Sequence, residues 1–326
     1  MTDSPSIVGS VFVGIDVALD KLDLARSDSG RTITFGNDAD GIARLVAALA
    51  SPRPALIVVE AIGGLERAVL DALLDAALPV ALVNPARVRH FAIGIGILAK
   101  TDPIDASVLM EFARRAEPRL SVKRSENQVE LEALVTCRRQ LTHVRTEQTN
   151  RRQRTSSKSA LKAIDAVLKT LGKQIEDLDK LIRKLIESDD DFNSIDKLLK
   201  SVPGVGAVLS ATLLAELAEL GSVGRGAVAA LVGVAPFNHD SGRMKGKRAI
   251  CGGRASVRCV LYMATVAAIR CNPVIKPFAE RLKKAGKQGK VVIVACMRKL
   301  LAILNAMIRQ NLSWSELQLV KNLQTT

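Results

Sequence analysis

The sequence has few aromatic residues and lacks the residue patterns of disulfide and zinc sites. Only 3% of its 326 residues are aromatic, whereas 48% are hydrophobic, so its cores must be built from aliphatic side chains. The five cysteines are odd in number and are never spaced as C-x-x-C, and the three histidines are scattered along the chain. We therefore expect neither a disulfide framework nor a zinc site, and we expect a reducing cytoplasm as the compartment.

Signals for secretion, membrane insertion and nucleotide binding are also missing. The N-terminus lacks the basic and apolar regions of a signal peptide. No run of about 18 uncharged apolar residues occurs, so no membrane partner is expected. The segment 94–101 nearly matches the phosphate-binding loop G-x-x-x-x-G-K-[ST], but Ala99 replaces its second glycine and no strand is predicted before it. An ATP-binding loop is therefore not expected.

Positive charge is abundant and unevenly distributed. The formal net charge is +14 and the isoelectric point is about 9.8, which favours a polyanionic partner. Residues 1–110 contain 9 Lys or Arg and 13 Asp or Glu, a net charge of −4, so the remaining residues carry +18. An acidic front part and a basic rear part suggest catalytic metal in the first and phosphate contacts in the second.

Four acidic residues of the front part stand at the ends of predicted elements. Asp16 ends the apolar run 11–15 and Glu60 ends the run 55–59, and both runs are typical of buried strands. Asp102 and Asp105 lie three residues apart, with Pro103 between them. This spacing predicts a helix with Asp102 at its N-cap and Asp105 on the same face of its first turn. These two acids could simply cap that helix.

The four acids together favour a metal site. A carboxylate at the end of a buried strand is costly unless something pairs it. A cluster of four would repel itself unless it held divalent cations, and oxygen-only ligands suit Mg²⁺ or Mn²⁺. Two such ions about 4 Å apart stabilise the attacking and leaving oxygens of a phosphodiester. We therefore predict that Asp16, Glu60, Asp102 and Asp105 form the metal site of a nuclease.

The front part also shows the element order of a mixed sheet. Segments 21–26 and 31–35 alternate in polarity around a turn and complete a three-stranded meander with the first strand. Helices are predicted at about residues 40–50 and 66–77, and a further strand at 79–83. This order predicts an α/β sheet flanked by helices.

The middle of the chain, from about residue 111 to 190, is helical in pattern and highly charged. A basic, polar break at 150–158 divides it, which predicts two long helices folded back as a hairpin arm. Arg151, Arg152 and Arg154 are then candidates for nucleic-acid contacts at an exposed tip. Such a charge run could also be a merely solvated loop.

The last third combines a glycine turn with many cations. Pro203-Gly204-Val205-Gly206 precedes a predicted helix at 207–220. A glycine turn that opens a helix offers backbone N–H groups at Gly204 and Gly206 to a DNA phosphate, although many such turns are merely tight. Residues 238–300 contain 15 Lys or Arg against 2 acids, and helices are predicted at 256–270, 277–284 and 291–309.

A glycine-rich loop at 240–248 has no hydrophobic period and contains Ser241. A serine flanked by glycine and surrounded by cations can reach a phosphate, although an ordinary turn serine is the commoner case. The phosphate-binding candidates of this region are Arg243, Lys245, Lys247, Arg248 and Arg254.

Taken in order, these motifs resemble those of one family. The sequence contains G-I-D, V-V-E-A, N-P-x-x-V-R-x-F-A, K-T-D-x-x-D-A, P-G-V-G, A-A-L-V-G-V-A-P-F, D-S-G, G-G-R-A-x-V-R and G-K-x-x-K-V. Over about residues 10–315 it resembles the DEDD insertion-sequence transposases, which are related to Piv-type DNA invertases and known as bridge-RNA-guided recombinases. One departure is the segment 61–64, where an A-T-G-like turn is common; it leaves Glu60 in place.

The resemblance implies an N-terminal domain of RNase H fold, similar to the RuvC Holliday-junction resolvase. It implies that Asp16, Glu60, Asp102 and Asp105 bind metal, and that Ser241 of a C-terminal transposase domain acts as a nucleophile on DNA. It further implies dimers that pair into tetramers, and a structured noncoding RNA that pairs with target and donor DNA.

We therefore predict a RuvC-like catalytic domain over residues 1–118, a helical coiled-coil arm over 119–195 and a mostly helical transposase domain over 196–326. The predicted function is DNA strand cleavage and exchange through a covalent phosphoserine, dependent on Mg²⁺ or Mn²⁺ and guided by a bridge RNA, in a prokaryotic cytoplasm at the nucleoid. Two alternatives remain. One is a RuvC-like junction nuclease that uses water, and the other is a non-catalytic nucleic-acid-binding protein whose acids are structural.

Overall fold

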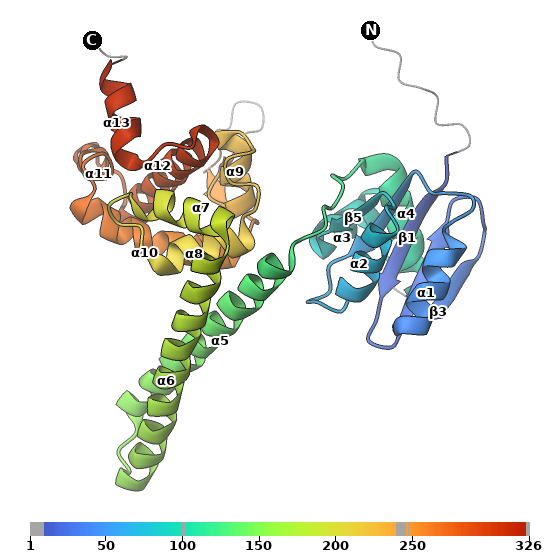
Figure 1. Cartoon of the computed structure of the whole chain (residues 1–326), viewed down its shortest axis with the longest axis horizontal. Helices are drawn as coiled ribbons and strands as arrows, with labels where there is room; N and C mark the ends of the chain where they lie inside the picture. Colours follow the sequence, from blue (N-terminus) through green and yellow to red (C-terminus); the bar gives the residue numbers. More distant parts are fainter. Residues whose placement is uncertain (1–9, 100–101, 239–245, 247, 324–326) are drawn as a thin grey trace. The chain divides into compact units, whose positions relative to one another are not determined.

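The chain folds into two compact units, Met1–Arg124 and Ser125–Thr326. The computed structural model describes residues 10–99, 102–238, 246 and 248–323 of them. Figure 1 shows a sheet with helices in the first unit and helices almost throughout the second. The finer division into three domains, with the arm separate from the last third, stays a prediction.

One five-stranded sheet organises the first unit. Its strands are β1 (Phe12–Val17), β2 (Lys21–Arg26), β3 (Thr32–Gly36), β4 (Leu56–Glu60) and β5 (Val80–Val83), in the order β3-β2-β1-β4-β5. The first three form an antiparallel meander, and β4 and β5 continue the sheet in parallel. The predicted mixed sheet of RNase H and RuvC-like type is thereby confirmed.

Helices cover both faces of this sheet. Side chains alternate along β1, so Val13 and Ile15 pack with α1 (Ala39–Ala48) and α2 (Arg67–Asp75). Phe12 points to the opposite face, which packs with α3 (Pro85–Gly94) and α4 (Asp102–Ala116). By the same alternation, Asp16 lies on the face of α3 and α4.

The helix α3 is an element that the periodicity did not predict. Its start nevertheless carries a local signal, because the Asn84 side chain accepts a hydrogen bond of 2.8 Å from the Ala86 amide and Pro85 occupies the first turn. The helix α4 begins at Asp102, which confirms the predicted helix around Pro103.

The helix α4 packs closely on β1. Gly14 lies in the middle of β1, and a Cβ atom added there would overlap the carbonyl oxygen of Ala106 and the amide nitrogen of Met110. Both atoms belong to the backbone of α4 and cannot move aside as a flexible side chain would. Glycine is therefore required at this position for the helix to approach the strand.

The second unit begins with the predicted hairpin. The helices α5 (Glu126–Arg154) and α6 (Lys158–Ser188) run side by side as a long arm, which confirms that prediction (Figure 1). The break between them is shorter than predicted, because α5 continues through the arginines up to Arg154 and Ser157 caps α6. Residues 117–125 are not helical, since Pro118 disfavours helical backbone at Glu117.

A helical domain completes the second unit. Its elements are α7 (Asp190–Lys200), α8 (Ala207–Glu216), α9 (Arg225–Val232), α10 (Ala255–Cys271), α11 (Ile275–Lys284), α12 (Gly289–Gln310), α13 (Trp314–Leu323) and the short strands β6 (Pro236–Phe237) and β7 (Ala249–Ile250). The predicted helix at 207–220 is wrong at its end: α8 stops at Glu216, and the chain turns through Gly221, which has a φ of 87°.

The helix α12 is the centre of the helical core. By length and composition it could cross a membrane, and α10 with α11 passes the same test only as a pair bent by 89°. However, half of the apolar stretch of α12 is buried, and Leu300, Leu304 and Met307 have no exposed surface. We therefore interpret α12 as a core helix.

Polar contacts fix the base of the arm. Asp189 ends α6 and caps α7, accepting a hydrogen bond of 3.0 Å from the Phe192 amide. The Asn127 amide of α5 donates to the same carboxylate at 2.8 Å. The hydrogen bond from Asn127 is the larger cause, and the one from the Phe192 amide the smaller cause, of a pKa of Asp189 below its usual range.

We predict that Gly14→Ala destabilises the protein by about 1–3 kcal/mol, because α4 must shift away from β1 to admit the new methyl group. Gly30→Ala is a matched control: no atom lies within 4 Å of its added Cβ, so the free energy of unfolding should change by less than about 0.5 kcal/mol. Urea unfolding of both variants measures the difference. Equal stability of the two variants would show that α4 does not need this close approach.

Candidate active site

Two acidic residues end neighbouring strands of the sheet. Ile15 and Val59 are paired in the parallel ladder of β1 and β4, so Asp16 and Glu60, the next residues, lie at the same level on adjacent strands. Adjacent strands are about 4.8 Å apart. Both side chains are half-buried, and alternation directs both to the face covered by α3 and α4.

The start of α4 supplies the third acid. Asp105 is half-buried and directly precedes Ala106, whose carbonyl meets β1 at Gly14. The close packing that requires Gly14 therefore also brings Asp105 toward the end of β1, two residues beyond that glycine. The side chain of Asp102, the fourth predicted acid, lies outside the described residues.

Glu60 and Asp105 line one hollow of about 350 Å³. Its other described lining residues are Pro85, Ala86, Val88, Arg89, Ala92, Ala99 and Val108. The walls thus come from the end of β4, the first turns of α3 and α4, and the segment between these helices. Two of the predicted acids are thereby brought together from positions 45 residues apart in sequence.

The donor chemistry of this site fits a hard divalent cation, because every acid is an oxygen ligand. Within the described part of the chain, however, no three His, Cys, Asp or Glu side chains are grouped closely enough to hold a metal ion. Glu60 and Asp105 line the same hollow, and Asp16 lies at the end of the strand next to that of Glu60. Metal binding by these acids stays a proposal.

One further carboxylate lies on this face, and the sequence patterns above do not predict it. Asp23 of β2 pairs with Asp16 across the antiparallel ladder, so both side chains share a face. It is only 4% exposed, accepts a hydrogen bond of 2.5 Å from the Thr34 hydroxyl and pairs with Lys21 at 3.0 Å. The alternation along β2 indicates this position, because Leu22 and Leu24 on either side point into the core on the other face of the sheet. Asp23 between them must therefore point to the face of Asp16.

The predicted serine loop belongs to the second unit. Ser241, Arg243, Lys245 and Lys247 lie outside the described residues. The flanking strands β6 and β7 pair with each other, Pro236 with Ile250 and Phe237 with Ala249, so they hold the two ends of this segment together. Arg248 is described and exposed.

The base of the loop is closely packed. Gly233 and Gly253 meet backbone to backbone, and a Cβ on either would overlap the other chain segment. Arg254 makes two hydrogen bonds with the Glu219 carboxylate, at 2.7 and 2.8 Å. Its guanidinium is thus engaged within the fold, and its predicted contact with nucleic acid stays a prediction.

The glycine turn before α8 has a structural role at one of its two glycines. Gly204 has a φ of 98°, and a Cβ there would lie 2.7 Å from the Ala268 Cα of α10. The Asn272 amide also donates to the Pro203 carbonyl at 3.0 Å. Gly206, in contrast, is the exposed N-cap of α8 and has no atom within 4 Å of an added Cβ. Only Gly206 leaves room for a phosphate.

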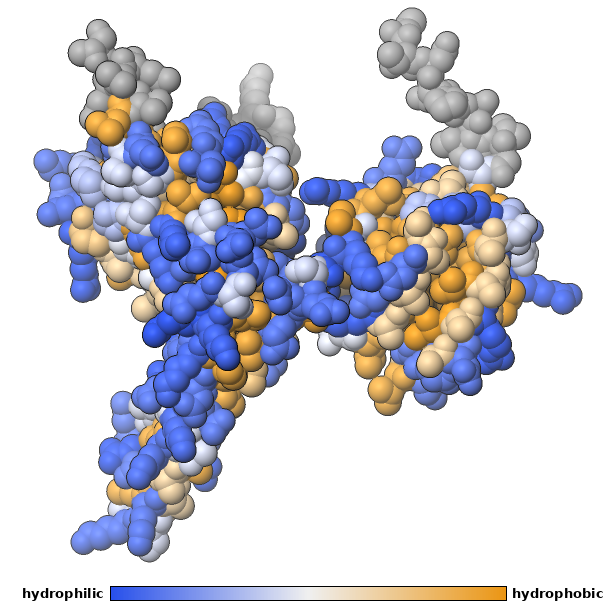
Figure 2. Space-filling view, viewed as in Figure 1, coloured by the Kyte–Doolittle hydropathy of each residue, from blue (hydrophilic) through white to orange (hydrophobic). Residues whose placement is uncertain are grey.

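The arginines at the end of the arm are exposed. Hydrophilic residues cover most of the visible face of the arm, including the tip where Arg151, Arg152 and Arg154 end α5 (Figure 2). Arg152 pairs with Asp165 of α6 at 2.5 Å, and this hydrogen bond lowers the pKa of Asp165. Part of the basic tip therefore closes the hairpin.

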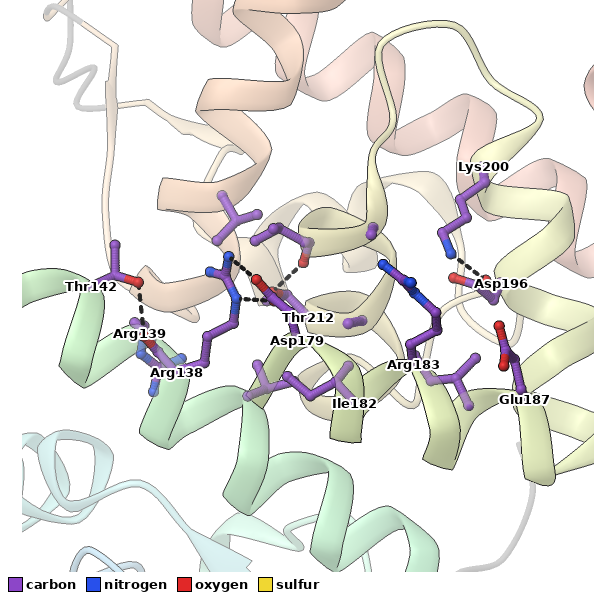
Figure 3. A pocket seen from close by; sticks show the side chains of 16 residues that line it. Arg138, Arg139, Thr142, Asp179, Ile182, Arg183, Glu187, Asp196, Lys200 and Thr212 are labelled. Carbon is purple, nitrogen blue, oxygen red and sulfur yellow. Dashed lines mark hydrogen bonds and ion pairs between the residues drawn. The ribbon is translucent and has the colours of Figure 1, made fainter. Parts of the chain in front are cut away.

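A second cavity, of about 340 Å³, lies where the arm joins the helical domain. Figure 3 shows Arg138 of α5 paired with Asp179 of α6, and Lys200 paired with Asp196 inside α7. The two distances are 2.5 and 2.7 Å. Both acids are paired with cations inside the second unit, the first across the two helices of the arm and the second within α7.

Comparison with known proteins decides the family. A family model described as a transposase of DEDD and IS110 type matches residues 13–155, and a second, described as the IS116/IS110/IS902 transposase family, matches residues 196–280. The chain belongs to the IS110 family of transposases. The first match contains Asp16, Glu60, Asp102 and Asp105, and the second contains the serine loop. Members of this family are DNA transposases and recombinases, and this chain is such an enzyme.

Individual relatives agree with the family. The pilin gene-inverting proteins of Moraxella lacunata and Moraxella bovis are each 29% identical over 319 residues, which is 93% of this chain and 97% of theirs. A 42 kDa protein of insertion element IS900 from Mycobacterium paratuberculosis is 31% identical over 35% of this chain and 30% of its own. T. thermophilus RuvC in complex with a Holliday junction substrate is 16% identical over 34% of this chain and 100% of that chain, with a TM-score of 0.27.

Proposed function

We propose that this transposase cuts and rejoins DNA in a reaction that depends on Mg²⁺ or Mn²⁺ and proceeds through a covalent bond between Ser241 and a DNA end. The observation that supports this most is the pair Glu60 and Asp105, half-buried in one hollow with Asp16 at the adjacent strand end. Half-buried carboxylates of like charge at one sheet edge need a cation to offset their repulsion.

Asp16, Glu60, Asp102 and Asp105 would hold the divalent cation. When bound, it would polarise a phosphate oxygen and stabilise the charge that develops during strand cleavage. The protein's own side chains must position the phosphodiester and supply the nucleophile.

Ser241 would supply that nucleophile. Its Oγ forms a bond to phosphorus while the bond from phosphorus to one sugar oxygen breaks, and the hydroxyl proton leaves as the sugar oxygen gains one. Rejoining reverses these changes at a different strand end. Since one phosphoester replaces another, no ATP is needed, and covalent catalysis divides one difficult step into two. Serine is a weak nucleophile at neutral pH, and the nearby cations of its loop offset phosphate charge.

The partners follow from charge and family. Donor and target DNA are the substrates, and the likeness to pilin gene-inverting proteins supports recombination over simple hydrolysis. We further propose a noncoding bridge RNA as guide, dimers that pair into tetramers, and a site in which the acids and the serine come from different protomers. The enzyme would act in the cytoplasm at the nucleoid. The alternative is a junction nuclease that uses water in place of Ser241.

The acids give a first prediction. Glu60→Gln, Asp105→Asn and the double variant Asp102→Asn with Asp105→Asn should abolish strand cleavage in Mg²⁺ while the protein stays folded, because lost repulsion offsets the loss of a cap worth about 1 kcal/mol. Asp71→Asn, at an exposed carboxylate of α2, is the control and should cleave like wild type. Full activity of the double variant would leave Asp102 and Asp105 as helix caps only.

The serine separates the two mechanisms. Wild type should leave protein attached to one DNA end, visible as a slowly migrating band of end-labelled DNA on a denaturing gel. Ser241→Ala should lose this band and all recombination, while stability changes by less than about 0.5 kcal/mol and DNA binding persists. If wild type yields only free ends and Ser241→Ala still cleaves, water is the nucleophile and the enzyme is a nuclease.

The guide RNA can be tested by binding alone. We expect the purified protein to bind the noncoding RNA of its element more tightly than a scrambled RNA of equal length. The charge of +18 behind residue 110 and the scarcity of aromatic residues favour recognition of backbone and shape, with sequence read by base pairing. Equal affinities for the two RNAs across a salt titration would contradict the proposal.

A further inference from the structure

Arg89 lies in the hollow that holds Glu60 and Asp105. It stands on α3, one turn after the residues Pro85 and Ala86 that line the same hollow. Among the described lining residues it is the one cation, and Glu60 and Asp105 are the two acids. Any anion that enters this hollow therefore meets Arg89.

The guanidinium of Arg89 is held in place without being neutralised. Its Nη2 donates a hydrogen bond of 2.9 Å to the backbone carbonyl of Leu98, which carries no net charge. Within the described part of the chain, no carboxylate takes a hydrogen bond from it. A guanidinium has five N–H donors in a fixed plane, so one bond to a carbonyl leaves donors for a second ligand.

The first turn of α3 adds to the positive character of this wall. Pro85 has no N–H and the Ala86 N–H donates to Asn84, but the dipole of α3 still places partial positive charge at its start, where these two residues line the hollow. The two acids that line the same hollow repel a phosphate. A phosphate that is to be cleaved beside them needs a cation on its other side.

We propose that Arg89 binds the phosphodiester on which Glu60 and Asp105 act, donating hydrogen bonds to its non-bridging oxygens. This inference rests on the proposed function, since it names the residue that positions the substrate for those acids. The guanidinium plane suits a phosphate because it offers two parallel N–H donors, which a lysine ammonium does not. The Leu98 carbonyl fixes the orientation of that plane before DNA arrives.

The test compares Arg89→Ala, Arg89→Lys and wild type. Arg44→Ala is the control, because Arg44 is an exposed cation of the same unit on α1, which covers the other face of the sheet. Binding to a labelled DNA duplex carrying an end of the element is measured by anisotropy in EDTA between 50 and 300 mM NaCl, roughly the range over which phosphate contacts are most sensitive to salt. Single-turnover cleavage is then measured in Mg²⁺.

We expect Arg89→Ala to weaken binding roughly tenfold and to reduce the slope of log K against log salt by about 0.9, the loss of one duplex phosphate contact. Arg89→Lys should keep the slope yet cleave more slowly than wild type, because it retains the charge and loses the paired donors. Arg44→Ala should match wild type in cleavage. If Arg89→Ala proves unfolded by thermal denaturation, Arg89→Lys carries the test through its unchanged slope and slower cleavage.

Arg89→Ala with the affinity, salt slope and cleavage rate of wild type would overturn the inference, as would an Arg44→Ala variant that shows equal losses. If the Arg89→Lys variant cleaves at the wild-type rate, the role of the paired donors is overturned. These outcomes differ from failure of the proposed function, in which wild type itself does not cleave in Mg²⁺, whatever the Arg89 variants bind.

Discussion

The candidate active site depends on the contact between the backbone of α4 and the backbone of β1. At Gly14 the helix approaches so closely that no side chain fits between them. This contact fixes the position of Asp105 along the direction of β1, near the strand end that carries Asp16. The parallel ladder of β1 and β4 places Glu60 level with Asp16 on the adjacent strand. Three acids distant in sequence are thus brought toward one edge by a single glycine and one strand register. A hollow opens at that edge because the helices α3 and α4 begin there.

Half-buried carboxylates of like charge are unfavourable unless a cation offsets them. The fold partly compensates by placing Asp23 against Lys21 and Thr34, so that this neighbouring acid is fully satisfied. Glu60 and Asp105 line the hollow, and Arg89 lines it too.

Much of this arrangement could be predicted from the sequence, and the remainder depends on contacts across the fold. Apolar runs that end in Asp16 and Glu60 predicted two strand ends, and the proline after Asp102 predicted the start of α4. The arm followed from its helical period. Asp23 and Arg89 were not predicted, because their roles depend on strand register and on a hollow formed by three elements. Arg254 was predicted from charge alone, and sequence could not reveal that Glu219 lies opposite it.

We propose that the edge of the sheet where β1 and β4 end binds a divalent metal ion. The most direct measurement is an anomalous difference map from crystals grown in Mn²⁺, which locates the ion without any assumption about activity. We expect a peak bounded by carboxylate oxygens from the set Asp16, Glu60, Asp102 and Asp105. A map that shows no peak there, with lysine or arginine side chains bound to these carboxylates, would contradict metal binding. The acids would then have a purely structural role.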